Sequence, residues 1–210
     1  MIFQDRRSAG KQLAEKLLEF KDNPQAIVLG LPRGGVITAD EVAKILNLPL
    51  DILVTRKIGA PQSAELAIGA ITEDGQPILN DDLIEALEIQ PEYVDSEIEK
   101  QKQEAKRRLE KYRQGRGVLD LKNKIAILVD DGIATGSTML AAVDSAETKG
   151  AAKIIVASPV IAADAADRFK VLATEVVCLD KPTYFEAIGQ FYESFEQTTD
   201  EEVEKIMKIK

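Results

Sequence analysis

The sequence predicts an α/β protein with a doubly wound, mainly parallel sheet. Two observations lead to this prediction. Short β-rich runs alternate with segments of helical periodicity, which is typical of a parallel sheet covered by helices on both faces. The runs are apolar throughout, as central strands buried on both faces should be. The chain of 210 residues is long enough for a real core, and we expect a single domain, 1–210.

The first quarter of the chain supplies two helices and two strands. Residues 8–20, SAGKQLAEKLLEF, have apolar residues at helical spacing, and Asn23-Pro24 ends this helix. The run AIVLG at 26–30 predicts a strand, and the loop LPRGG leads from it into a helix over 36–47. The next strand is expected over 50–57, LDILVTRK.

The middle of the chain departs from this order. IGAIT and PILN, at 68–72 and 77–80, are separated by EDGQ and indicate a hairpin-like excursion. Residues 91–114 are highly charged, with few apolar positions, which predicts a long helix with one narrow buried stripe.

The remaining strands and helices return to the regular alternation. Three further β-rich runs are IAILVD, KIIVASPV and TEVVCL, and helices are expected between them at STMLAAVDSAETKG and AADAADRFKVL. Strands and helices in this order complete a parallel sheet.

Composition excludes several classes of function. The formal net charge is −9, whereas sequence-independent nucleic-acid binding needs clustered Lys and Arg. Histidine is absent, which excludes His-dependent triads, zinc sites and proton shuttles. The single cysteine, Cys178, allows no disulfide framework, and no apolar run approaches the roughly 18 residues of a membrane span. We expect a cytoplasmic protein without a signal segment and with neither nucleic-acid nor membrane partners.

Three informative loops are expected at one sheet edge, because ligands bind beyond the carboxyl ends of parallel strands. They are LPRGG, TRKIGAP and DDGIATGST. In the third, Gly132 and Gly136 allow close backbone approach, and a helix that begins near Ser137 offers free N–H groups to an anion such as a phosphate monoester. The plainer alternative is a strand-to-helix turn with Ser137 as its N-cap.

Two carboxylates, Asp130 and Asp131, directly precede this loop. Successive strand residues point to opposite sides, so one carboxylate can meet a ligand while the other faces the neighbouring loop. Carboxylates repel a phosphate and must serve another group. Vicinal sugar hydroxyls, bound directly or through Mg²⁺, are the natural partners. The pattern therefore describes a ribose 5-phosphate site.

The stretch ILVDDGIATGST resembles the phosphoribosyl pyrophosphate (PRPP) motif of type I phosphoribosyltransferases. LPRGG resembles that family's pyrophosphate-binding loop, and RKIG resembles a basic segment found in several members. LGLPRGGVITADEVA, RKIGAP…ELAIGA and AIGQFYESFEQTTDEEV are similar to a bacterial group described only as predicted phosphoribosyltransferases, and this likeness covers most of the chain. The resemblance implies a type I phosphoribosyltransferase-like core. To this core we add a flexible loop plus helical insertion at 58–116, with the loop in 58–80, and a small C-terminal hood at 181–210.

The resemblance also implies which residues hold the sugar phosphate. Asp130 and Asp131 would bind the 2- and 3-hydroxyls of ribose, and would hold Mg²⁺ together with the substrate. The amides and hydroxyls expected to hold the 5-phosphate are those of Gly132, Ile133, Ala134, Thr135, Gly136, Ser137 and Thr138.

For the leaving group, the resemblance points to the other two loops. Arg33, Gly34 and Gly35 would take the pyrophosphate, and Arg56 and Lys57 would neutralise it as it leaves. A planar guanidinium can grip a phosphate with two hydrogen bonds, and the glycines let the backbone approach. Taken singly, Arg33 would be a surface arginine in a turn, and Arg56 and Lys57 a solvated strand end.

The reaction implied by the resemblance is displacement of Mg²⁺-pyrophosphate from C1 of the ribose by a nitrogen nucleophile. Positioning and preorganised charge supply such catalysis, which suits a chain without histidine. We expect the catalytic residues to be Asp131, Arg56 and Lys57. Asp131 or Glu65 is a candidate acceptor for the proton of the nucleophile, although Glu65 also fits a solvated loop acid.

The acceptor is less well defined by the sequence. Aromatic residues cluster at 181–197, and a base could stack on one of them, Tyr184, Phe185, Phe191 or Tyr192. The alternative for each is ordinary packing of a terminal segment onto the core. We find no lysine- or acid-based base selector, so the acceptor is an unknown nitrogenous base or other amine.

Two functions from different classes remain open. One is a transferase acting on PRPP, and the other is a non-catalytic regulatory module that senses PRPP or a nucleotide. Arg33, Arg56 and Lys57 favour catalysis, since holding ribose phosphate alone would not need them. The charged helix at 91–114 offers a lid or a homodimer contact, with a solvated face as the default.

Overall fold

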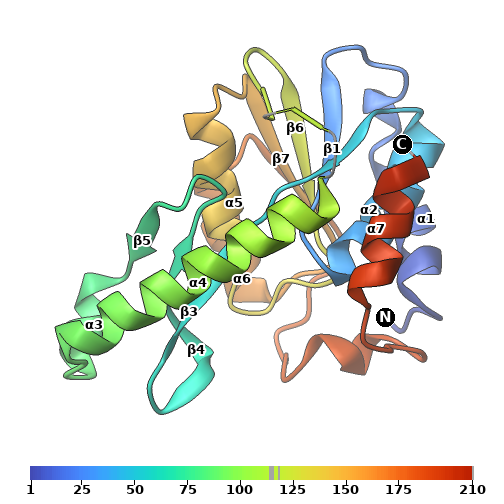
Figure 1. Cartoon of the computed structure of the whole chain (residues 1–210). Coiled ribbons are helices and arrows are strands. Elements are labelled where there is room, and N and C mark those ends of the chain that lie inside the picture. The colour runs from blue at the N-terminus through green and yellow to red at the C-terminus, as the bar shows by residue number, and fades with distance from the viewer. Residues whose placement is uncertain (114–115, 118, 210) are drawn as a thin grey trace.

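The computed structural model describes residues 1–113, 116–117 and 119–209, apart from the side chains at positions 64, 65 and 209. Its centre is a five-stranded sheet in the order β2-β1-β6-β7-β8 (Figure 1). All neighbouring pairs in this sheet are parallel. The strands are β1 (Ala26–Gly30), β2 (Leu50–Ile52), β6 (Ile125–Val129), β7 (Lys153–Val160) and β8 (Glu175–Asp180). The predicted α/β class with a mainly parallel sheet is confirmed.

Helices cover both faces of this sheet (Figure 1). Alternate residues of one strand enter different cores: Val28 shares a core with Leu13 of α1, whereas Leu29 shares one with Met139 of α5. Because each strand is buried on both faces, its sequence is apolar throughout. One layer contains α1 (Arg6–Lys16), α2 (Gly34–Leu46) and α7 (Asp200–Ile209), and the other contains α5 (Ser137–Thr148) and α6 (Ala163–Leu172).

A second sheet is small and antiparallel, and it consists of β3 (Arg56–Ala60), β4 (Ser63–Ile71) and β5 (Pro77–Leu79). It corrects the predicted strand over 50–57. Ile52 pairs with Gly30, the last residue of β1, and the chain then leaves the main sheet so that Arg56 pairs with Ile71 of β4. The hairpin-like pairing predicted around EDGQ is confirmed as β4 and β5. Most of the segment expected as a loop, 58–80, is therefore strand, and its mobility stays a prediction.

The insertion continues with α3 (Asp81–Ala86) and the long helix α4 (Pro91–Tyr112), which crosses from the small sheet towards α7 (Figure 1). This agrees with the helix predicted over 91–114, whose last residue lies outside the described residues. Arg113, just beyond the helix, is buried and ties the insertion to the main sheet. Its Nε lies 3.2 Å from Asp51, and its NH1 lies 2.9 Å from Glu73.

The C-terminal segment returns over the core in two pieces. Residues of the first piece form the 3₁₀ helix Ile188–Phe191 and a bridge between Tyr192 and Phe3. The second piece is α7, a helix that the sequence analysis did not predict, and it buries Val203 against the main core. Within the described residues, none of the helices combines the length and apolar character that a membrane crossing requires.

Candidate active site

The end of the turn after β1 and the first two residues of α2, Gly34 and Gly35, together called the glycine turn, lie against the acid pair that follows β6. A Cβ atom added to Gly34 would lie 2.0 Å from Oδ2 of Asp131, and one added to Gly35 would lie 2.7 Å from Oδ1 of Asp130. Real Cβ contacts are essentially never this short, so only glycine fits at both positions. The parallel pairing of β1 with β6 ends at Gly30 and Val129, which brings the two loops together at one edge.

The two carboxylates of the acid pair diverge, as expected for successive residues at a strand end. Asp130 lines a cavity with the loop that follows it, whereas Oδ2 of Asp131 accepts a hydrogen bond from Nε of Arg6 at 2.6 Å. Oδ1 of Asp130 also accepts a hydrogen bond from the Asp131 N–H at 2.9 Å. The Tyr192 hydroxyl donates to the main-chain carbonyl of Asp131, which ties the C-terminal segment to the pair.

The environment of Asp130 disfavours its negative charge. Burial of the carboxyl and, next, the charge of Asp131 raise the pKa of Asp130 well above its ordinary value. The charge of Arg6 opposes this effect without cancelling it. A bound cation or a hydroxyl group that donates to the carboxylates would therefore be favoured here.

The loop 132–138 lines a cavity of about 170 Å³ together with Asp130 and Lys57. Gly136 has a φ of 79° and is the N-cap of α5, which makes no side-chain capping bond. The helix expected to begin near Ser137 does begin there. Its N-cap residue is Gly136, whereas the plainer alternative from the sequence placed Ser137 at the N-cap. The first N–H groups of a helix have no acceptor within it, so this end suits an anion.

A second cavity, of about 420 Å³, is lined in part by Gly34 of the glycine turn and is rich in arginine. Burial of Arg56 and then the positive charge of Arg108 lower the pKa of Arg56, and Arg33 adds to the effect. The residues that line this second cavity are Arg6, Arg33, Gly34, Arg56, Arg108, Phe195, Gln197 and Thr198. Sequence reasoning selected Arg33 and Arg56 and missed Arg6 and Arg108, which lie on helices without a distinguishing motif.

Arg56 and Lys57 do not form one cationic unit. As neighbours in β3, they point to opposite sides, and Arg56 lines the arginine cavity while Lys57 lines the cavity of the 132–138 loop. The preceding residue, Thr55, donates its hydroxyl to the carbonyl of Thr138 at 3.1 Å. The TRKIGAP segment thus contacts the 132–138 loop directly.

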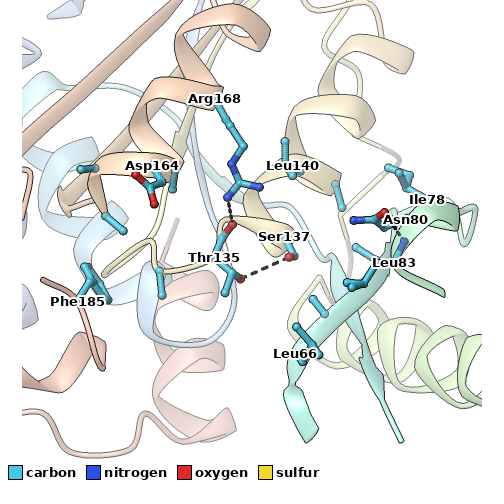
Figure 2. A pocket seen from close by; sticks show the side chains of 18 of the residues that line it. Leu66, Ile78, Asn80, Leu83, Thr135, Ser137, Leu140, Asp164, Arg168 and Phe185 are labelled. Carbon is cyan, nitrogen blue, oxygen red and sulfur yellow. Dashed lines mark hydrogen bonds between the residues drawn. The ribbon is translucent and has the colours of Figure 1, made fainter. Parts of the chain in front are cut away.

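A third cavity, of about 640 Å³, separates the small sheet from α5, α6 and the C-terminal segment. Figure 2 shows Phe185 at one side, Leu66 and Ile78 at the other, and Thr135 between them. Arg168 of α6 donates to the carbonyl of Thr135.

The four aromatic residues expected in the hood lie in different environments. Phe185 lines the third cavity, and Tyr184 is 71% exposed. Phe191 and Tyr192 are each only 7% exposed and pack in one cluster with Phe3. Of the four, Phe185 is therefore the side chain placed to meet a ligand in this cavity. The side chain of Glu65, the other proposed proton acceptor, lies outside the described residues.

Comparison of the chain with models of known protein families identifies its family. The model of the phosphoribosyl transferase domain matches residues 3–196. The chain belongs to the phosphoribosyl transferase family. Both the 132–138 loop and the glycine turn after β1 fall within the matched region of this phosphoribosyl transferase domain.

The relatives agree with this assignment. The chain is 48% identical over 202 residues to the Mycobacterium tuberculosis protein named "Putative phosphoribosyl transferase", in strains H37Rv and CDC 1551. The match covers 96% of this chain and 45% of the relative, so the chain spans less than half the length of these curated relatives. The crystal structure of TT1426 from Thermus thermophilus is 41% identical, with a TM-score of 0.82 over 99% of this chain and 98% of that one.

A more distant structure shares the fold alone. The AQ2163 protein of Aquifex aeolicus is 11% identical, with a TM-score of 0.51 over 84% of this chain and 74% of that one.

Among the residues of this phosphoribosyl transferase domain that the structure describes, there is no group of three or more His, Cys, Asp or Glu side chains that could hold a metal ion.

Proposed function

We propose that this domain transfers ribose 5-phosphate from PRPP to a nitrogenous acceptor and releases pyrophosphate. The observation that carries the proposal is the position of the acid pair. Asp130 lines the cavity of the 132–138 loop, Asp131 is paired with Arg6 of the arginine-rich cavity, and Gly34 and Gly35 lie against the two carboxylates. PRPP has the same order of groups: a 5-phosphate, a ribose and a pyrophosphate.

The proposed placement of the substrate follows these three parts. The 5-phosphate is held by the amides and hydroxyls of 132–138, and the ribose hydroxyls are held by Asp130 and Asp131. The pyrophosphate enters the cavity that contains Arg33 and Arg56, where the glycine turn brings main-chain N–H groups close. Lys57 adds positive charge from the cavity of the 132–138 loop.

Magnesium fits the donor set at the acid pair. Carboxylate oxygens are hard ligands, and burial together with the charge of Asp131 raises the pKa of Asp130, so a bound cation would favour its charged form. We propose that Asp130 and Asp131 hold Mg²⁺ together with oxygens of the substrate. When bound, the ion would neutralise part of the charge on the pyrophosphate.

In the proposed reaction, the bond from C1 to the pyrophosphate oxygen breaks, and its electron pair stays on the leaving group. The acceptor nitrogen gives its lone pair to C1, and its proton passes to Asp131 or to solvent. Arg33 and Arg56 stabilise the negative charge that develops on the leaving group, and the acid pair stabilises the positive charge on the ribose. The chemistry requires no histidine.

The acceptor site is proposed in the third cavity, where Phe185 offers a ring face and Thr135 of the phosphate loop forms part of the wall. A planar nitrogenous ring could stack on Phe185 and approach the sugar from the side opposite the arginine cavity.

A screen for pyrophosphate release tests this function. The full chain would be incubated with PRPP, Mg²⁺ and a panel of nucleobases and simple amines. Release that depends on one acceptor class, and that is lost in Asp130→Asn/Asp131→Asn, would support transfer. Asp144→Asn, an exposed acid on α5, is the matched control. Tight PRPP binding without release from any acceptor would instead support the sensor function.

A further inference from the structure

The arginine cavity draws its four guanidinium groups from four separate elements. Arg33 belongs to the turn after β1 and Arg56 to β3, within the LPRGG and TRKIGAP motifs that the sequence analysis selected. Arg6 comes from the first turn of α1, and Arg108 comes from the last third of the inserted helix α4. The side chains of Arg6 and Arg108 are only 12% and 13% exposed, so both are held inside the structure.

The burial of Arg56 among the other cavity arginines disfavours its positive charge when no ligand is bound. The chain as a whole carries a net charge of −9, yet the cavity gathers arginines whose mutual repulsion, after burial, lowers the pKa of Arg56. Acids compensate part of it, since Arg6 lies 2.6 Å from Asp131, Arg33 lies 3.5 Å from Asp200 and Arg108 lies 2.8 Å from Glu104. Arg56 has the neutral side chain of Gln101 as its hydrogen-bond partner. A small anion with several charges is the ligand that would relieve the remaining repulsion.

Arg6 is fixed by three different contacts. Its Nε donates to Asp131 at 2.6 Å, and its NH1 donates to the carbonyl of Glu196 at 2.7 Å. Its guanidinium carbon lies 3.7 Å from the centre of the Phe195 ring, which is within cation–π range. Arg6 is thus preorganised at the junction between the sugar-binding acid and the arginine cavity.

The inserted helix α4 contributes to the cavity in two ways. Arg108 lines it directly while its Nε is held by Glu104 at 2.8 Å. Gln101, two turns earlier and buried, accepts a hydrogen bond from Nε of Arg56 at 2.9 Å. The helix that the sequence presented as a solvated or lid-like element therefore orients one cavity arginine and supplies another.

We propose that Arg6 and Arg108 are further pyrophosphate-binding residues, so that α1 and the inserted helix α4 form part of the leaving-group site. This rests on the proposed function. Arg6 additionally positions Asp131 for the ribose, whereas Arg108 serves the pyrophosphate alone.

The chain offers a matched control beside each residue. Arg7, next to Arg6 on α1, is half exposed and pairs with Glu41 at 2.7 Å. Arg107, next to Arg108 on α4, is half exposed and shares the same partner, Glu104, at 2.7 Å. Neither control lines the arginine cavity.

Calorimetric titration of the full chain with inorganic pyrophosphate, and separately with ribose 5-phosphate, tests the proposal in the presence of Mg²⁺. We expect Arg6→Gln and Arg108→Gln each to weaken pyrophosphate binding about tenfold or more, as loss of a charge-assisted contact does. Arg7→Gln and Arg107→Gln should match the wild type. Ribose 5-phosphate binding should weaken in Arg6→Gln and stay unchanged in Arg108→Gln.

The lysine variants Arg6→Lys and Arg108→Lys keep the positive charge, so they should retain more pyrophosphate affinity than the glutamine variants. A general loss of folding would weaken the lysine and glutamine variants alike. Equal pyrophosphate affinity in Arg6→Gln, Arg108→Gln and their controls would overturn this inference and leave the proposed function standing. Absence of pyrophosphate and PRPP binding by the wild type would overturn both.

Discussion

Gly34 lies directly against the carboxylate of Asp131, at the point where the chain passes from β1 into α2. A methyl group on Gly34 would lie 2.0 Å from Oδ2 of Asp131 and 2.8 Å from Nε of Arg6. The glycine therefore sets the distance between the proposed leaving-group site and the proposed sugar site. Any side chain here must displace both partners of the Arg6–Asp131 ion pair.

We predict that Gly34→Ala abolishes measurable PRPP binding and lowers the stability of the fold by about 1–3 kcal/mol, the usual cost of overpacking. Calorimetry and thermal unfolding measure the two effects. Gly117→Ala is the control, because an added Cβ there meets nothing within 4 Å. Unchanged PRPP affinity in Gly34→Ala would show that the turn does not bound the site.

Asp130 should reduce stability in the free protein while supporting ligand binding. Its pKa is raised in the folded state, so keeping it ionised at neutral pH costs folding free energy. We predict that Asp130→Asn raises the melting temperature in Mg²⁺-free buffer at neutral pH and weakens ribose 5-phosphate binding. The gain should disappear at a pH below the unfolded-state value of about 3.9, where the wild-type group is protonated in both states. A lower melting temperature for the variant at neutral pH would contradict this.

Asp200 should make the fold sensitive to acid. The hydroxyl of Tyr112 donates to it, Lys111 and Arg107 pair with it, and together they hold its pKa below the ordinary value. A depressed folded-state pKa stabilises the fold above the unfolded value of about 3.9, and this contribution is lost as the pH falls further.

We therefore predict that Asp200→Asn is less stable than wild type at neutral pH and that the difference shrinks below about pH 4. Urea unfolding across the acid range measures this, with the exposed Asp144→Asn as control. A constant difference at every pH would assign the loss to packing of α7 instead of to charge.

Two phenylalanines in the C-terminal segment should behave differently. Phe185→Leu changes a wall of the proposed acceptor cavity, so we predict a higher KM for the acceptor with unchanged PRPP affinity. Phe191→Leu removes a buried ring whose centre lies 5.0 Å from the centre of the Phe185 ring, so this variant should lower the stability of the fold instead. Steady-state kinetics and thermal unfolding separate them. Equal KM values for the acceptor in wild type and Phe185→Leu would show that the acceptor does not bind in this cavity.

Much of this architecture is encoded in local patterns. The apolar runs predicted the strands of the main sheet, and DDGIATGST predicted a strand end and a helix that begins near Ser137. The N-cap of that helix is Gly136, whereas the plainer alternative from the sequence had placed Ser137 there. The strand over 50–57 was wrong because the break after Ile52 depends on where β1 ends and on the antiparallel partner Ile71, neither of which is near in sequence.

The arginine cavity shows the same limit for the site. Arg33 and Arg56 stand in the recognisable motifs LPRGG and TRKIGAP, whereas Arg6 contacts Asp131 across 125 positions of sequence. Arg108 looks like any other charge on a solvated helix until the fold turns one side of α4 towards β3. Only the tertiary packing of α1 and α4 distinguishes these two arginines from their neighbours Arg7 and Arg107.

The most direct test of the account is calorimetric titration of PRPP into the wild-type chain and into Asp130→Asn/Asp131→Asn, with Mg²⁺ present throughout. We predict saturable binding by the wild type and by the Asp144→Asn control, and loss of binding in the double variant. Wild-type protein that takes up no PRPP at millimolar concentration, or a double variant that binds it as well as the wild type does, would contradict the central claim.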